Sequence, residues 1–179
     1  MKRLHEIIMD SQVDLLLEKE KAHLFEMIPD LQTLTFEMSG TKDLWEHSKT
    51  VCYKVPSGPV LRWAALFHDI GKPVVFRTSK GSTFPNHAMV GAEIWIDNSS
   101  RFHKILTKKQ RLQVERLIRY HMEVLLYTPR WNDRAVRNLA LRCEGDLPML
   151  IMLAKADGGD VENLNQLNRR ISQLKGSVS

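Results

Sequence analysis

The sequence predicts a single all-α domain, and three observations support this prediction. Apolar residues recur at three- and four-residue steps along most of the 179-residue chain, which is the period of an α-helix. Turn segments containing Pro and Gly separate these stretches, and the sequence has no two-residue hairpin signal, internal repeat or low-complexity tract. With 43% apolar residues, including four Trp and six Phe, the chain can bury a substantial core. A disordered or fibrous protein is therefore excluded.

The first part of the chain, residues 1–40, is expected to form an N-terminal helical extension. Its helically spaced apolar positions run from Leu15 to Met27 and stop near Pro29. A second helix is expected to begin at residues 41–43 and to close before Pro56, because its apolar positions again follow three- and four-residue steps.

Residues 60–70 are apolar on nearly every side, which is typical of a buried central helix. Gly71 and Pro73 are expected to end this helix. Residues 74–86 hold several Ser, Thr, Gly and Pro residues, and the segment is predicted to be a loop.

Four further helices are expected in the second half of the chain. They cover residues 87–96, a helix opened by a Thr107–Gln110 capping box and running to Met122, a helix capped by Asp133, and residues 147–157. The last segment, residues 159–179, carries apolar residues at 3-4-3 spacing and is predicted to be a helix. This stripe packs either on its own domain or at the seam of a homodimer, and the sequence leaves both readings open. Its residues are Leu164, Leu167, Ile171 and Leu174.

Composition also restricts where the protein works. No stretch approaches the roughly 18 apolar residues of a membrane span, so no membrane association is expected. Glu6 interrupts the N-terminal apolar run and no small-residue cleavage site follows it, which argues against a secretory signal. Cys52 and Cys143 form no CxxC pattern and are expected to be reduced core thiols. A cytoplasmic protein is the expectation.

The net charge of +5 is unevenly distributed. Residues 101–142 hold eleven Lys and Arg against three acids, whereas the rest of the chain holds fifteen against eighteen. A basic segment of this kind favours an anionic partner, which could be a nucleotide, a nucleic acid or an acidic protein. A solvated helix surface explains the same charges, and Tyr127 and Trp131 in this segment could stack on bases.

Four of the seven histidines sit on or at the start of predicted helices among apolar neighbours: His47, His68, His87 and His121. A single histidine in such a place is most often a hydrogen-bonded core residue. The pair His68-Asp69, however, ends the most apolar helix, and burying both groups is costly without compensation. A divalent ion such as Mn, Fe, Co, Ni or Zn would compensate, because imidazole nitrogen and carboxylate oxygen both suit these metals.

Two further residues fit a site around this pair. Asp157 ends another apolar helix and could complete a set of four ligands with His47, although it could equally be a boundary residue. Lys72 follows Asp69 by three residues on the same helical face. It is well placed to hold an oxyanion of a bound substrate.

The order of these residues resembles the H…HD…D signature of HD-domain metal-dependent phosphohydrolases, and especially the HD domain of bacterial CCA-adding tRNA nucleotidyltransferases. The resemblance covers roughly residues 41–158. The stretches that carry it are Asp43-Leu44-Trp45-Glu46-His47, residues 61–73 with His68-Asp69-Ile70-Gly71-Lys72, Phe84-Pro85-Asn86-His87, Val90-Gly91-Ala92-Glu93, residues 117–122 ending His121-Met122, Asp133-Arg134-Ala135-Val136-Arg137, and Leu153-Ala154-Lys155-Ala156-Asp157.

The resemblance implies a compact HD-domain helical bundle over residues 41–158 and a divalent metal ion, which could be Mn, Co, Ni, Fe, Zn or Mg. The implied metal ligands are His47, His68, Asp69 and Asp157, and a second ion could bind at His87 and His121. The implied catalytic residues are Asp69, Lys72, His87 and His121, and the implied substrate-binding residues are Arg62, Lys72 and Arg119.

The implied function is hydrolysis of a phosphate ester of a nucleotide or an RNA 3′-end, as a 2′,3′-cyclic phosphodiesterase, 2′-nucleotidase or phosphatase. Two alternatives remain open: a 5′-nucleotidase or dNTP hydrolase, and a non-catalytic HD module that binds nucleotide or RNA. The Gly-Ser and paired-carboxylate motif of the nucleotidyltransferase head is not found in the sequence, so CCA addition is not expected. Where the family often has His-Glu, this sequence has His87-Ala88.

Overall fold

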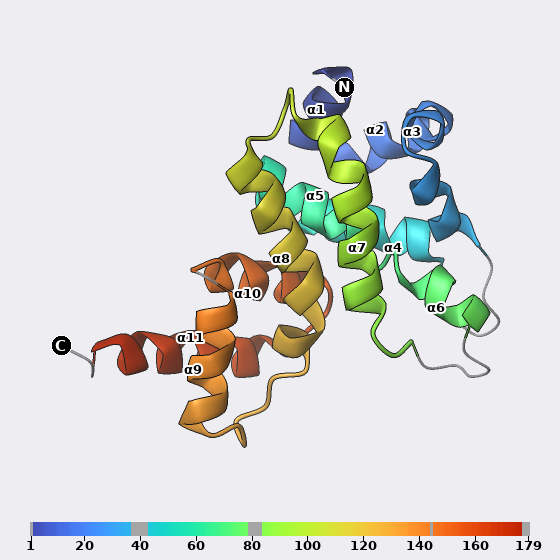
Figure 1. Ribbon diagram of the computed structural model, residues 1–179. Coiled ribbons are helices and arrows are strands. Elements are labelled where there is room, and N and C mark those ends of the chain that lie inside the picture. The colour runs from blue at the N-terminus through green and yellow to red at the C-terminus, as the bar shows by residue number, and fades with distance from the viewer. Residues whose placement is uncertain (1, 37–42, 79–83, 144, 177–179) are drawn as a thin grey trace.

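Helix α5 (Pro59–Phe67) runs through the centre of the molecule, and every residue from 60 to 67 is buried. Helices α1, α4, α8 and α10 all pack against it (Figure 1). The computed structural model describes residues 2–36, 43–78, 84–143 and 145–176, and these residues form helices and connecting turns without a strand. The predicted all-α bundle is therefore confirmed.

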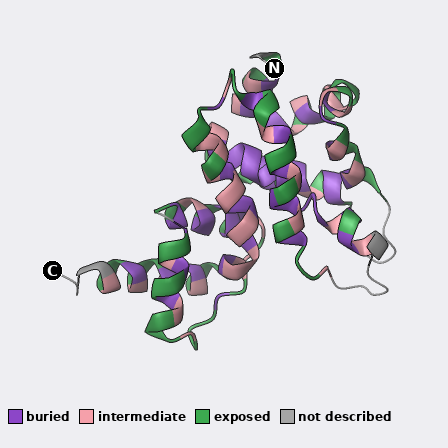
Figure 2. Ribbon diagram, in the orientation of Figure 1, coloured by how far each residue is buried: buried purple, intermediate pink, exposed green. Residues whose placement is uncertain are grey.

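The remaining elements pack on α5 directly or through its neighbours, with α9 and α11 at the far end beside α10, and the buried apolar residues form a single core (Figure 2). In chain order they are α1 (Lys2–Met9), α2 (Val13–Lys19), α3 (Lys21–Met27), the 3-10 helix η1 (Pro29–Thr35), α4 (Leu44–Lys54), α6 (Lys72–Thr78), α7 (His87–Ser99), the 3-10 helix η2 (Ser100–Phe102), α8 (Lys108–Leu125), α9 (Asp133–Arg142), α10 (Leu147–Ala156) and α11 (Val161–Gly176).

The N-terminal extension is joined to the central helices by buried polar contacts as well as by apolar packing. The guanidinium of Arg62 on α5 donates hydrogen bonds to the backbone carbonyls of Ile8 and Asp10. The carboxylate of Glu18 on α2 accepts hydrogen bonds from the Trp45 indole, at 2.7 Å, and from the Lys49 ammonium, at 2.6 Å, both on α4. Helices α1–α3 and η1 thus share the core of the rest of the chain.

Several helix boundaries differ from the prediction. The segment predicted to be a loop begins with α6, because Pro73 lies in the first turn of a helix, where its fixed φ is favourable and its missing N–H costs nothing. The predicted loop residues 79–83 lie outside the described residues, as do residues 41 and 42 at the predicted start of α4. The N-cap of α9 is Asn132, whose side chain accepts from the Ala135 N–H, and Asp133 is the first residue inside the helix.

Other predicted features are confirmed. The capping box at Thr107 and Gln110 is present at the start of α8. Cys52 and Cys143 are free and buried, and burial raises the pKa of each thiol to about 12. Such thiols stay protonated and unreactive at neutral pH.

Helix α11 packs on α9 and α10 of its own chain. Leu164, Leu167 and Ile171 of the predicted stripe are buried there, so this stripe has a partner within the chain. Arg170 on the same helix donates to the hydroxyl of Tyr127 and to the backbone carbonyl of Trp131. Because Tyr127 is buried, the expectation that its ring stacks on bases is wrong, whereas Trp131 packs against the core and is only partly buried.

Candidate metal centre

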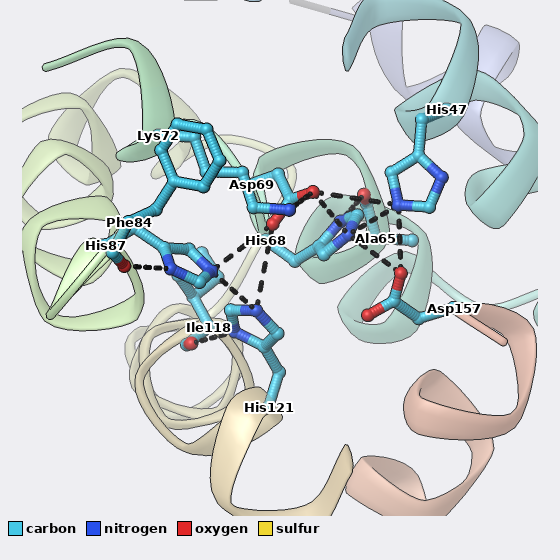
Figure 3. A network of polar contacts seen from close by, with 10 residues as sticks. All are labelled: His47, Ala65, His68, Asp69, Lys72, Phe84, His87, Ile118, His121 and Asp157. Atoms are coloured by element: carbon cyan, nitrogen blue, oxygen red, sulfur yellow. Dashed lines mark hydrogen bonds and ion pairs between the residues drawn. The ribbon is translucent and has the colours of Figure 1, made fainter. Parts of the chain in front are cut away.

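Six polar side chains from five parts of the chain form one cluster, with the buried carboxylate of Asp69 at its centre (Figure 3). The others are His47 from α4, His68 from the turn after α5, His87 at the start of α7, His121 from α8 and Asp157 at the end of α10. Helix α5 stops at Phe67, so His68 and Asp69 lie in a turn rather than within the helix that the sequence predicted to reach residue 70.

The first group of donor atoms lies on one side of Asp69. The Oδ2 atom of Asp69 is 3.4 Å from the Nε2 of His68 and 3.6 Å from the Nε2 of His47. These two nitrogens are 3.3 Å apart. The Oδ1 of Asp157 lies 2.8 Å from the nitrogen of His47 and 3.4 Å from that of His68. The structure therefore brings together the four residues implied to be metal ligands.

The second group lies on the other side of the same carboxylate. The Oδ1 of Asp69 is 3.4 Å from the Nε2 of His87 and 3.8 Å from the Nε2 of His121. The two imidazole nitrogens are 3.3 Å apart. Asp69 thus presents one oxygen to each group and stands between them (Figure 3).

Backbone carbonyls fix the orientation of three of the four imidazoles. The Nδ1 atoms of His68, His87 and His121 lie 2.7–2.8 Å from the carbonyl oxygens of the residues three positions earlier. A carbonyl only accepts, so each Nδ1 carries a proton and each Nε2 is the atom that faces Asp69. This second hydrogen bond is typical of metal-binding histidines. The carbonyls belong to Ala65, Phe84 and Ile118.

The donor atoms fit a divalent ion in both groups. Bonds of about 2.0–2.1 Å at angles between octahedral and tetrahedral values place neighbouring ligand atoms roughly 3.0–3.4 Å apart. The measured separations in the two groups, 2.8–3.6 Å and 3.3–3.8 Å, lie around this range. In the second group, Nε2 of neutral His121 and the carboxylate of Asp69 both have only lone pairs to offer one another, and a cation between them would satisfy both.

The charges within the cluster are strongly coupled. Burial opposes ionisation of Asp69, which is only 1% exposed, but the neighbouring His68 charge, hydrogen bonds from His68 and His87, and Lys72 hold its pKa well below the usual value. Burial likewise opposes protonation of His68, yet Asp69 and Asp157 outweigh it and raise the pKa of His68 to about 10. Burial and the charge of His68 lower the pKa of His121 to about 3. The proton on His68 and the Lys72 ammonium therefore balance the charges of the two carboxylates, and metal binding by His68 would require the release of that proton.

Lys72, which is one of the implied catalytic residues, contacts the cluster through Asp69. Its ammonium donates to the Oδ2 of Asp69 at 2.6 Å and lies 5.9 Å from the centre of the Phe84 ring. Its side chain is 23% exposed, so it can reach both the cluster and solvent.

The two arginines predicted to bind substrate do not join the cluster. Arg62 is buried and its guanidinium is occupied by the carbonyls of Ile8 and Asp10, so we leave it out of the proposed site. Arg119 is paired with Glu115 on α8 and has no contact with the cluster among the described residues. These side chains hold helices together or pair on the surface instead.

A groove of about 370 Å³ opens beside the first group, with His47 and Asp157 in its wall. Thr50 and Lys54 of α4 also line it, and neither was among the predicted site residues. A signal was present, since they follow His47 by three and seven residues and so share its helical face. In contrast, the sequence does not indicate which backbone carbonyls orient the histidines, because every residue has such a carbonyl whatever its side chain.

A known protein family matches the segment that carries the cluster. A model of the HD domain family matches residues 44–158. The chain is also 37% identical over 121 residues to the CC-adding tRNA nucleotidyltransferase of Thermus thermophilus; the match covers 63% of this chain and 26% of that protein. No helix among the described residues is long and apolar enough to cross a membrane. Since the family model spans well over half of the chain, the protein belongs to the HD domain family.

Proposed function

We propose that this protein is a metal-dependent phosphohydrolase that acts on nucleotides or RNA ends, as a 2′,3′-cyclic phosphodiesterase, 2′-nucleotidase or phosphatase. Membership of the HD family supports the general class of reaction. The match to a tRNA nucleotidyltransferase supports a nucleotide or RNA substrate. The single observation that carries the proposal is the convergence of the imidazole nitrogens of four histidines on the two oxygens of Asp69, with Asp157 beside two of them. The histidines are His47, His68, His87 and His121, and Asp157 contacts His47 and His68.

In the proposed site, His47, His68, Asp69 and Asp157 would hold one divalent ion, and His87 and His121 with Asp69 would hold a second if one binds. Such an ion supplies a Lewis acid that lowers the pKa of water and draws charge from phosphorus. The carbonyls of Ala65, Phe84 and Ile118 keep three Nε2 atoms aimed at the ion positions.

Lys72 is proposed to act on the substrate rather than on the ion. An ammonium group is a poor ligand but a good partner for a phosphoryl oxygen on which negative charge builds during attack. Its contact with Asp69 at 2.6 Å places it beside both donor groups. Its side chain is partly exposed, so the ammonium could also contact a phosphoryl oxygen of a substrate bound there.

The test starts from protein treated with chelator and reloaded separately with Mn, Co, Ni or Mg. Each sample is offered 2′,3′-cyclic AMP, 2′-AMP, 5′-dAMP and dATP, and release of phosphate, of 2′- or 3′-nucleotide, or of triphosphate is measured. We expect turnover of the first two substrates. Turnover of only 5′-dAMP or dATP would favour the nucleotidase or dNTP hydrolase alternative instead.

The variant Asp69→Ala should abolish turnover, by at least about 10³-fold, with the helical content retained, because it removes the carboxylate shared by both groups. Asp97→Ala on α7, whose acid has no contact with the cluster among the described residues, is the matched control and should keep wild-type rates. Normal turnover by Asp69→Ala would remove the site assignment. Binding of nucleotide by the wild type without turnover under any metal would favour the non-catalytic reading.

A further inference from the structure

The groove beside His47 and Asp157 extends well past the candidate metal centre. It is lined along one face of α4, from the N-cap residue Asp43 to Lys54 in the last turn, and on the opposite side by Ala156–Gly158. Seven residues separate His47 from Lys54, which is roughly 10 Å along a helix axis. The part of the groove between His47 and Lys54 therefore lies beside the metal centre and is open to other parts of a substrate.

The two ends of the groove differ in charge. At the N-terminal end of α4, the Asp43 carboxylate accepts from the Glu46 N–H as the helix cap, and the Glu46 carboxylate pairs with Lys49 at 2.7 Å. At the other end, Lys54 is exposed and has no ion pair or hydrogen bond among the described residues. Anionic material entering the groove is repelled at the Asp43 end and attracted at the Lys54 end.

We propose that the groove along α4 binds the nucleotide adjoining the scissile phosphate, with Lys54 contacting its phosphodiester, so that an oligonucleotide end is preferred over a mononucleotide. This inference rests on the proposed function and adds the substrate class to it. A mononucleotide carries no second phosphate for Lys54, whereas a dinucleotide or longer RNA does. The exposed hydroxyl of Thr50, between His47 and Lys54, is available to the intervening sugar.

Lys54 also has a structural role in its helix, and the test must distinguish this role from a contact with substrate phosphate. A cation in the last turn stabilises a helix through its dipole. That role predicts a small loss of stability in a Lys54 variant, and it predicts the same effect on every substrate. Only a phosphate contact predicts an effect that depends on substrate length.

The experiment compares kcat/KM for two substrates. One is 2′-AMP, and the other is the 3′,5′-linked dinucleotide ApA with the same 2′-phosphate on its 3′-terminal residue. The experiment uses the full chain as wild type, Lys54→Gln, and the control Lys104→Gln, another exposed lysine that does not line the groove. We expect the dinucleotide to be favoured about fivefold or more in the wild type and in the control, and this preference to disappear in Lys54→Gln. Raising the salt concentration should reduce the preference in the wild type.

Binding of the dephosphorylated dinucleotide, measured by calorimetry, separates the two proposals. The quantity to compare is kcat/KM for the dinucleotide divided by kcat/KM for 2′-AMP. If this ratio is the same in the wild type and in Lys54→Gln, the groove inference is overturned and the hydrolase proposal stands. If the wild type hydrolyses neither substrate, the hydrolase proposal fails, and weaker dinucleotide binding by Lys54→Gln than by the control still supports the groove. Equal binding by both variants overturns it.

Discussion

Replacing Gly71 by alanine is expected to separate the turn that carries Asp69 from helix α7. A Cβ atom at this position would lie 2.1 Å from the backbone carbonyl oxygen of His87 and 2.7 Å from the backbone nitrogen of Gly91. Ordinary contacts of a Cβ begin at about 3.4 Å. Both obstructing atoms are backbone, so no side chain can rotate away and the two elements must move apart by about 1 Å.

The expected loss in the free energy of unfolding follows from the packing at this contact. Forcing an extra methyl into a close-packed interior typically costs about 1–3 kcal/mol, and a backbone obstruction belongs at the upper end. A loss of about 3 kcal/mol lowers the midpoint of thermal unfolding by roughly 6–12 °C for a domain of this size. Circular dichroism during heating and in urea measures both quantities. Metal affinity should fall as well, because the 3.4 Å separation between the Asp69 and His87 donor atoms widens.

Gly58→Ala is the matched control. A Cβ at Gly58 would meet nothing within 4 Å, and this residue lies in extended backbone at the start of α5. The control should change the free energy of unfolding by less than about 1 kcal/mol, the usual difference between Gly and Ala at a helix N-cap. Equal stability of Gly71→Ala and wild type would refute the argument that this contact sets the distance between the two elements.

Three further outcomes are expected. Lys72→Ala should lower kcat or raise KM at least tenfold while elemental analysis finds unchanged metal content, since the ammonium acts on substrate; loss of the metal would contradict this role. Arg62→Met should lower the free energy of unfolding by about 2 kcal/mol with kcat and KM unchanged, because two backbone carbonyls lose their donor; a raised KM would restore Arg62 as a substrate ligand. Hydrogen bonding from Lys49 and Trp45 lowers the pKa of Glu18 from 4.5 to about 2. The ionised carboxylate therefore contributes its full stabilisation of the folded state above pH 4.5, and this contribution is lost as the pH falls toward 2. Because its side chain is 48% exposed, urea titrations should find Glu18→Gln less stable than wild type by about 1 kcal/mol at pH 6 and equally stable near pH 2; a constant difference would contradict the ion pair.

Helix periodicity and end signals were sufficient to predict most of the bundle. The Thr107 capping box and the all-round apolar segment after Pro59 identified α8 and α5 because each signal has a local physical cause. Pro73 was misread because proline ends one helix and begins another with equal ease, and sequence alone does not tell which. The choice of Asn132 over Asp133 as the cap also depended on where the chain turns.

The cluster itself could be predicted only as a set of residue types. The spacing of His68-Asp69 on an apolar segment pointed to a compensating ion, and the structure brings the other four side chains to it. Arg62 shows the limit of such reasoning, since its position near the motif gave no sign that it faces α1. A basic residue beside a motif reveals its partner only once distant segments are placed.

The contact of Glu18 with Trp45, and of Arg62 with α1, has a practical consequence for anyone shortening this protein. The family match begins at residue 44, yet Trp45 is shielded by residues far ahead of that point, including Phe25, whose ring lies 5.0 Å away. A fragment trimmed to the matched segment would expose this indole to water and would leave the buried Arg62 guanidinium without the carbonyls of Ile8 and Asp10. It would be expected to aggregate on expression, and any search for activity should therefore retain the first 35 residues.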